Sequence, residues 1–302
     1  MKKLIFLFCL FCAAGSLAAQ QDPMFTKYMF NSLIYANPAY AGTHEYGSLS
    51  VGGRKQWAGI EGAPLTSMLA FENRILDERV GLGLTFTYDK IGIDRTLILG
   101  TNYAYRMEVG RGELALGLSA GLVHYHSRVS LLGPWTTDDP AFANAADPAA
   151  IFQFGAGVQY HEQGFFVGFA APRIYANDTN KPIELTRHYY GYGGYNFELP
   201  GLDVSLIPSL FARYEPSAPF QADINLRAQF QDVFSAGVTY RTDQTFGAMF
   251  QVQVLDNLLL GYAYDITTSQ LRRFSSGTHE VTVGYLLGQP FRSPVDTPRF
   301  FF

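Results

Sequence analysis

The 302-residue sequence has almost no cysteine, and this shortage excludes several kinds of site. Its two cysteines, Cys9 and Cys12, lie in residues 1–19, which have the form of a signal peptide. That segment begins with Lys2-Lys3, continues as a short apolar core and ends in small residues suited to cleavage. The mature chain therefore has no disulfide, no thiol nucleophile and no cysteine-based metal site.

The sequence is also poor in charge and lacks a long apolar run. Charged residues make up 16% of the chain and aromatic residues 15%, with a net charge of −4, which gives no support to nucleic-acid binding. No apolar run approaches the roughly 20 residues of a membrane-spanning helix. Low charge and many aromatics without such a helix are typical of a transmembrane β-barrel, whose strands carry apolar residues at alternate positions.

Apolar residues alternate with small or polar ones in many segments of the chain. In 79–90, Leu82, Leu84, Phe86 and Tyr88 alternate with glycine and threonine. A half-buried sheet of a soluble protein would alternate too, but these runs are long enough to cross a bilayer and often end in an aromatic residue. In 219–230 the alternation predicts a lumen-facing set, namely Gln221, Asp223, Asn225, Arg227 and Gln229.

Counting these runs predicts an all-β fold, an antiparallel outer-membrane barrel of about 14 strands. The expected strands are 45–57, 64–75, 79–90, 93–108, 112–127, 150–161, 164–173, 186–198, 201–214, 219–230, 232–242, 244–255, 257–268 and 277–288. Connections near 128–149, 174–185 and 269–276 are longer than those that alternate with them, and barrels place short turns in the periplasm. We therefore expect both termini in the periplasm and four parts: signal peptide 1–19, arm 20–44, barrel 45–288 and tail 289–302.

The arm, residues 20–44, is rich in aromatic residues and turn signals. Proline removes backbone donors, which excludes a lipid-facing strand, and a disordered linker would be poor in aromatics. We expect the arm to dock in the lumen or at the periplasmic mouth, using Phe25, Tyr28, Phe30, Tyr35, Asn37, Pro38, Tyr40 and Gly42. The tail ends in three phenylalanines and has three prolines, so it is either an assembly signal or a peptide for a periplasmic partner.

Candidate chemistry in the chain is sparse. His124 and His126 lie on one strand face, but one strand offers two metal ligands and the sequence identifies no third. The G-x-S-x-G pattern of many serine hydrolases is absent. Arg227 and Asp223 are a candidate lumen ion pair, either as structural bracing or as part of a pore lining. We expect a protein that is not an enzyme and holds neither metal nor cofactor.

The start of the mature chain resembles a known family. Its motif residues are Gln21-Asp22-Pro23, Phe25, Tyr28-Met29-Phe30-Asn31, Asn37 to Gly42, Arg54, Gln56-Trp57, Gly59, Gly62-Ala63-Pro64 and Thr66. This order resembles the PorP/SprF family of Bacteroidetes outer-membrane proteins. The specific part covers about the first quarter of the chain, and the remainder matches only in barrel character. Lys27 stands where the family pattern suggests Gln, and Glu72 where it suggests Asp.

The resemblance implies an integral outer-membrane component of the type IX secretion system. Such a component supports secretion or surface anchoring of large cargo, such as gliding adhesins with type B C-terminal domains. It also implies partners: periplasmic ring lipoproteins, a peptidoglycan-binding protein and a cargo C-terminal domain. Arg54, Gln56 and Trp57 join the arm as candidate partner-binding or arm-docking residues. The alternatives are a porin or substrate-specific channel and, third, a barrel enzyme.

Overall fold

A computed structural model describes residues 33–44, 46–75, 78–128, 149–176, 186–199, 201, 203–216, 218–231 and 233–288. The signal peptide, the C-terminal tail and the arm before Leu33 lie outside these residues. So do the arm anchors Phe25, Tyr28 and Phe30 and most of two long connections. No helix among the described residues is long and apolar enough to cross a membrane.

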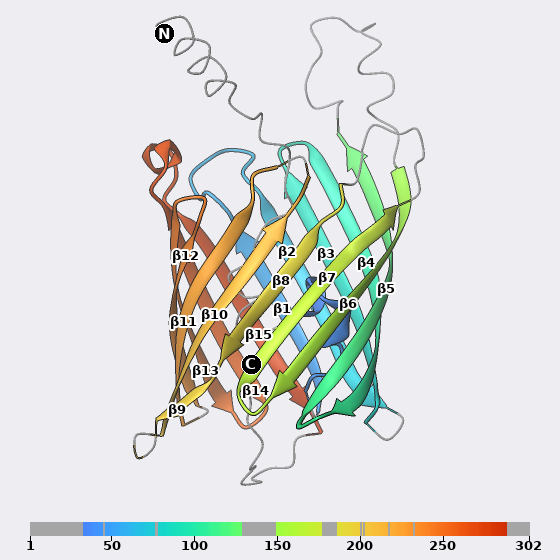
Figure 1. The fold of residues 1–302 in the computed structure, drawn as a ribbon. Coiled ribbons are helices and arrows are strands. Elements are labelled where there is room, and N and C mark those ends of the chain that lie inside the picture. Colours follow the sequence, from blue (N-terminus) through green and yellow to red (C-terminus); the bar gives the residue numbers. More distant parts are fainter. Residues whose placement is uncertain are drawn as a thin grey trace, which may run out of the picture.

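The strands form a closed antiparallel barrel (Figure 1). Consecutive strands pair with each other, except that β8 and β9 both pair with β10. The first strand also pairs with the last, and the β10–β11 pairing completes the wall. The strands are β1 (Gly47–Lys55), β2 (Leu65–Ile75), β3 (Val80–Ile91), β4 (Asp94–Val109), β5 (Gly112–Ser127), β6 (Ala149–Glu162), β7 (Phe165–Ala176), β8 (Tyr189–Tyr195), β9 (Phe197–Leu199), β10 (Val204–Tyr214), β11 (Gln221–Phe230), β12 (Phe234–Arg241), β13 (Thr245–Leu255), β14 (Leu258–Thr267) and β15 (Thr278–Leu287).

The predicted barrel of about 14 strands is confirmed. β8 and β9 are two halves of one crossing, because both pair with β10 and only Asn196 separates them. The Asn196 amide instead donates to the carbonyl of Gly164 in the β6–β7 turn, 2.9 Å away. Two short strands therefore stand where the sequence predicts one.

The two ends of the barrel differ in their connections. At one end, the short-turn end, the connections are brief; examples are 110–111, 163–164 and 256–257. The opposite end, the long-connection end, carries the longest ones, although 92–93 and 242–244 there are also short. Gly47 pairs with Leu287, so β1 begins and β15 ends together at the short-turn end.

Alternation along the strands separates a lipid-facing surface from the lumen. A row of register partners on the outer face is apolar from β12 round to β6: Phe234, Val252, Leu260, Val283, Val51, Leu69, Phe86, Leu99, Leu122 and Phe152. Most inward-facing polar side chains are buried, among them Glu72, Arg106 and Asp265. Apolar side chains outside and polar ones inside are the arrangement of a membrane barrel.

Candidate functional site: a chain segment bound in the lumen

Residues Leu33–His44, here called the lumenal segment, lie inside the barrel (Figure 1). The segment contains two short 3-10 helices, η2 (Leu33–Tyr35) and η3 (Pro38–Tyr40). The amide of Asn37 donates to the carbonyl of Leu33 at 2.8 Å, and the amide of Thr43 to that of Tyr40 at 2.9 Å. Some backbone groups of the segment thus form hydrogen bonds within the segment, and the barrel wall must supply partners for the other buried N–H and C=O groups.

Asn37 ties the segment to β6 and β8. Its side-chain oxygen caps η3 by accepting from the Ala39 amide at 2.9 Å, as asparagine does at helix starts. Its side-chain nitrogen donates to the carbonyl of Val158 at 3.1 Å and to the hydroxyl of Tyr192 at 3.0 Å. The residue has no exposed surface, and its hydrogen bonds connect η3 to strands β6 and β8 of the barrel wall. Pro38 follows at the first helical position, where a missing donor costs nothing.

Glycines in the wall make room for the backbone of the segment. A Cβ atom on Gly81 of β3 would lie 1.9 Å from the Ala41 carbonyl oxygen, and one on Gly117 of β5 would lie 2.1 Å from the Ala39 nitrogen. A Cβ on Gly157 of β6 would lie 2.0 Å from the Asn37 side-chain oxygen. The wall therefore accepts this segment only because it lacks side chains at these points.

Arg106 of β4 holds the end of η3. Its guanidinium donates to the carbonyls of Ala39 at 3.2 Å and Ala41 at 3.0 Å, and to the Thr43 hydroxyl at 2.7 Å. It also forms an ion pair with Glu113 of β5. The last carbonyls of a helix have no partner of their own, and the planar guanidinium can reach several at once.

Glu72 and Arg74 of β2 hold the exit of the segment. One Glu72 oxygen accepts from the Gly42 amide at 3.0 Å, and the other lies 2.7 Å from His44 Nδ1. Arg74 donates to the carbonyls of Gly42 and of Thr43, the latter at 3.2 Å. Gly42 adopts a φ of +69°, which favours glycine at this turn. Glu72, Arg74 and Arg106 are called the clasp below.

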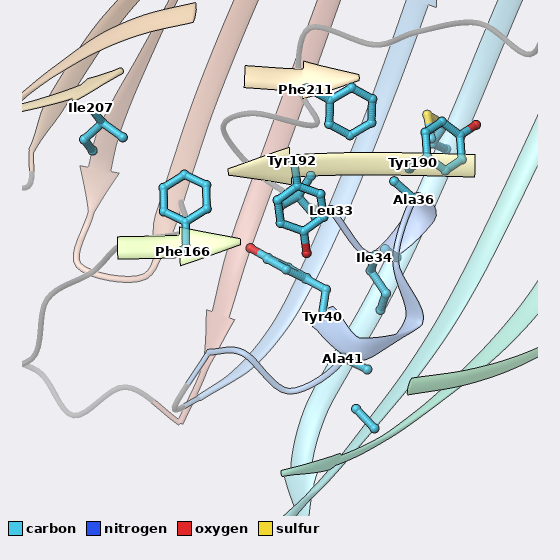
Figure 2. Packing of buried hydrophobic residues seen from close by; sticks show 13 residues of the cluster. Leu33, Ile34, Ala36, Tyr40, Ala41, Phe166, Tyr190, Tyr192, Ile207 and Phe211 are labelled. Carbon is cyan, nitrogen blue, oxygen red and sulfur yellow. The ribbon is translucent and has the colours of Figure 1, made fainter. Parts of the chain in front are cut away.

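Apolar packing supplies the other face of the contact (Figure 2). Ile34 and Tyr40 lie in one buried cluster with Tyr192 of β8 and Phe211 of β10. The rings of Tyr192 and Phe211 are stacked with centroids 6.3 Å apart. Burying a side chain of this size stabilises by about 1.5–3 kcal/mol before ordering costs, so the segment is held by packing as well as by the clasp.

A separate ion network lies along one side of the lumen, on β11, β12, β14, β15 and β1. Arg54 contacts Asp265 at 3.1 Å and Glu280 at 3.0 Å. Arg241 contacts Asp223 at 2.9 Å and Asp265 at 3.6 Å. All five side chains are buried. Removing one partner of such a network leaves an uncompensated buried charge, so we interpret it as bracing for this side of the barrel.

A third polar cluster lies toward the long-connection end. His188 and Glu215 approach within 3.1 Å and are both buried. Arg173 of β7 donates to Gln153 of β6 at 2.9 Å and to the carbonyl of Thr186 at 3.1 Å. This cluster joins β6, β7 and the residues that flank β8 and β10.

The structure divides the sequence-predicted arm-docking residues between two places. Tyr35, Asn37, Pro38, Tyr40 and Gly42 all belong to the lumenal segment. Arg54 lies in the ion network instead, the Gln56 amide donates to the carbonyl of Pro64 at 3.0 Å, and the Trp57 amide donates to the Thr278 hydroxyl at 3.2 Å. The difference follows from β1, because the segment joins its start and these three residues stand at its other end.

The lumen-facing set of β11 points inward, with one change of partner. Asp223, Asn225 and Arg227 are buried; Gln221 and Gln229 are half-buried. Asp223 pairs with Arg241 of the adjacent strand, so the expected pair of Asp223 with Arg227 is wrong. The Cα atoms of residues four apart along a strand are separated by about 13 Å, whereas register partners such as Asp223 and Arg241 are about 5 Å apart and meet with less extension of their side chains.

Sequence reasoning missed the clasp residues as a site. The alternation of β4 contained the signal: Arg106 shares its face with Asn102 and Ala104, whereas Tyr103 and Tyr105 occupy the other face. An arginine on the small and polar face of a barrel strand needs a partner in the lumen. Nothing in one strand says that the partner is the chain's own arm.

Among the described residues, no group of three or more His, Cys, Asp or Glu side chains could hold a metal ion. His124 and His126 share the lipid-facing surface of β5, since their register partners Leu97 and Arg95 stand on the outer face of β4. The arrangement around the lumenal segment offers hydrogen bonds and ion pairs that bind a chain segment.

Two solved barrels share the fold at low identity. The crystal structure of the Acinetobacter baumannii outer membrane protein Omp33 is 7% identical, with a TM-score of 0.51 over 82% of this chain and 100% of that one. The CymD monoaromatic hydrocarbon channel is 12% identical, with a TM-score of 0.52 over 84% and 91%. At this identity the likeness concerns the fold alone. No functionally curated protein matches the chain.

Residues 17–285 match the family described as type IX secretion system membrane protein PorP/SprF. That range contains the lumenal segment and nearly all of the barrel, including the motif residues at the start of the mature chain. The family is a secretion membrane component and not a known family of enzymes. The chain therefore belongs to the PorP/SprF family of type IX secretion system membrane proteins.

Proposed function

We propose that the protein acts in type IX secretion as a closed outer-membrane scaffold. In this role it supports the secretion or surface anchoring of large cargo, such as adhesins with type B C-terminal domains. The observation that carries the proposal is the lumenal segment, which uses the barrel interior to bind the chain's own arm. With its interior occupied by the arm, such a barrel would contact cargo and partners through the arm and through the two ends of the barrel.

The buried charges support a closed lumen over an open pore. A water-filled channel exposes inward-facing polar residues to solvent. Here Arg54 and Arg241 are at most 4% exposed, and the clasp side of the lumen is filled by the segment. The runner-up function, a porin or substrate-specific channel, would require the segment to leave the lumen so that water and solutes could pass.

The proposed orientation places the short-turn end in the periplasm, where barrels keep their short turns. Both ends of the barrel sequence, Gly47 and Leu287, lie at that end. The arm and the C-terminal tail would then be within reach of periplasmic ring lipoproteins and a peptidoglycan-binding protein. A cargo C-terminal domain is the third proposed partner.

Trypsin treatment of intact cells tests the orientation. Arg272 and Arg273 are exposed on η5 (Gln270–Arg273), in the β14–β15 connection at the long-connection end. Cleavage there in intact cells is expected, and cleavage at Arg111 in the opposite turn is expected only after the outer membrane is permeabilised. The reverse pattern would contradict the orientation.

Secretion assays test the role itself. Deleting residues 21–35, which removes η2, should leave a barrel that inserts but no longer secretes cargo or co-purifies its partners. Arg106→Ala should weaken secretion in the same direction, and Arg111→Ala, in an exposed turn, is the matched control. Normal secretion by the deletion variant, with normal barrel levels, would refute the use of the arm.

Conductance in planar bilayers separates the scaffold from the pore. A closed scaffold predicts little current through the wild type and a rise in Arg106→Ala, because loss of this clasp residue weakens the docking of the segment. A pore predicts steady wild-type current whose selectivity changes in Arg227→Gln. Large wild-type current would favour the runner-up.

A further inference from the structure

The cations of the barrel strands are sorted by residue type and by face. Among the described strands, the lysines and arginines that face the lumen are all arginines: Arg54, Arg74, Arg106, Arg173, Arg213, Arg227 and Arg241. Three others face outward, namely Lys55 of β1, Lys90 of β3 and Arg95 of β4. Five of these lumen arginines contact the segment or the polar clusters described above, namely Arg54, Arg74, Arg106, Arg173 and Arg241. The outward three face away from the lumen.

The three outward cations belong to one row of register partners. Lys55 pairs with Leu65 of β2, Leu65 with Lys90, and Lys90 with Arg95. The row continues to His126 on one side and to His279 on the other. Strands lie about 4.8 Å apart, so the row spans about 24 Å of the outer surface, and barrel tilt makes it climb by roughly 3 Å per strand.

Each cation is the last outward-facing residue of its strand at the long-connection end. Below Lys90 the outward residues of β3 are Tyr88 and Phe86, and below Arg95 those of β4 are Leu97 and Leu99. Aromatic residues such as Tyr88 mark the level where a barrel leaves the hydrocarbon. The cations therefore stand at the level of lipid headgroups, with stems that can lie along the apolar wall.

Among the described residues the row itself contains no carboxylate; the exposed Glu61 stands beside it in the β1–β2 connection. Lys55 and Lys90 are exposed, and neither forms an ion pair there. Arg95 donates to the backbone carbonyls of Gly92 at 3.0 Å and Asp94 at 2.7 Å. The outward carboxylate Glu162 stands at the opposite, short-turn end of β6. The row itself is therefore positively charged, at the long-connection end and on one side of the barrel.

We propose that Lys55, Lys90 and Arg95 bind the phosphoryl groups of an outer-leaflet glycolipid headgroup of the lipid A type. Lysine is a good point-charge partner for phosphate, and arginine can bind it through two parallel hydrogen bonds. A multiply phosphorylated headgroup matches cations spread over several strands better than a single phosphate does. The site does not depend on the role in secretion; only its assignment to the outer leaflet depends on the proposed orientation.

The test titrates the purified full-length barrel with diphosphoryl lipid A in detergent and counts bound lipid by native mass spectrometry. Each surface cation contributes roughly a five-fold gain in affinity, so Lys55→Gln/Lys90→Gln should bind about 25-fold more weakly. The matched control is Arg272→Gln/Arg273→Gln, which removes two exposed cations at the same end but outside the row. Heat-dependent migration in SDS confirms that each variant is folded.

The comparison lipids decide between sources of phosphate. Dephosphorylated lipid A should bind no better to the wild type than to Lys55→Gln/Lys90→Gln, and inorganic phosphate should compete only weakly. Equal losses in the row variant and the control variant would overturn the site. Binding of phosphatidylglycerol as tight as that of diphosphoryl lipid A would overturn the glycolipid assignment.

Discussion

Replacing Arg106 with alanine should release the lumenal segment from the wall. In the wild type, the guanidinium donates to the carbonyls of Ala39 and Ala41 and to the Thr43 hydroxyl within a buried site. A hydrogen bond to a charged group contributes about 1.5–3 kcal/mol, so losing the two bonds to the Ala39 and Ala41 carbonyls without replacement weakens docking by about 3–6 kcal/mol. The ratio of docked to released segment should then fall roughly 10²–10⁴-fold.

Hydrogen exchange measured by mass spectrometry reports this change directly. Amides of the segment exchange only when it opens, so a peptide covering 33–44 should exchange faster in Arg106→Ala by the same factor. Arg106→Lys keeps the charge but loses the planar fork, and we expect an intermediate rate. Peptides from β11 to β14 provide the internal reference. An unchanged rate for 33–44 would show that Arg106 does not hold the segment.

Three further substitutions test other contacts. Asn37→Ala removes the cap and both wall hydrogen bonds, so docking should weaken by about 2–4 kcal/mol, measured by the same exchange experiment. Gly117→Val places a side chain where even a Cβ would lie 2.1 Å from the Ala39 nitrogen; the segment should exchange rapidly while the barrel still migrates as a folded species in SDS. Arg241→Ala leaves Asp223 buried without this partner at a cost of about 3–5 kcal/mol, so the temperature at which the barrel unfolds in SDS should fall, and Arg241→Ala/Asp223→Ala should recover part of the loss.

The barrel could be predicted because a period of two is a local property. Leu82, Leu84, Phe86 and Tyr88 alternate with small residues in the sequence and face outward in the structure. Each strand shows the same alternation, so about 14 such runs predicted the strands of the barrel wall and their approximate ends. The break between β8 and β9 was not predicted, since Asn196 interrupts the pairing only through a contact with the Gly164 carbonyl on another turn.

The site was only partly predictable because its contacts are distant in sequence. The aromatic residues and turn signals of the arm indicated docking, and Asn37 and Tyr40 are part of the buried segment. The wall partners of Asn37, Val158 and Tyr192, lie more than 120 residues away, and the wall partners of the arm carbonyls are arginines. Strand register decides which arginine meets which carboxylate, and a single sequence does not reveal the register across the whole barrel.

A designed disulfide tests most directly whether the arm occupies the lumen. A Cβ on Gly83 would lie 3.4 Å from the Cβ of Ala41, close to the roughly 3.5–4.5 Å of a disulfide, and the expected mature chain contains no other cysteine. Ala41→Cys/Gly83→Cys should therefore form an internal disulfide in the outer membrane, detected as a cross-linked tryptic peptide. Ala41→Cys/Gly247→Cys, with its second cysteine on β13, should not. Equal cross-linking of both pairs, or of neither in correctly inserted barrels, would contradict the account.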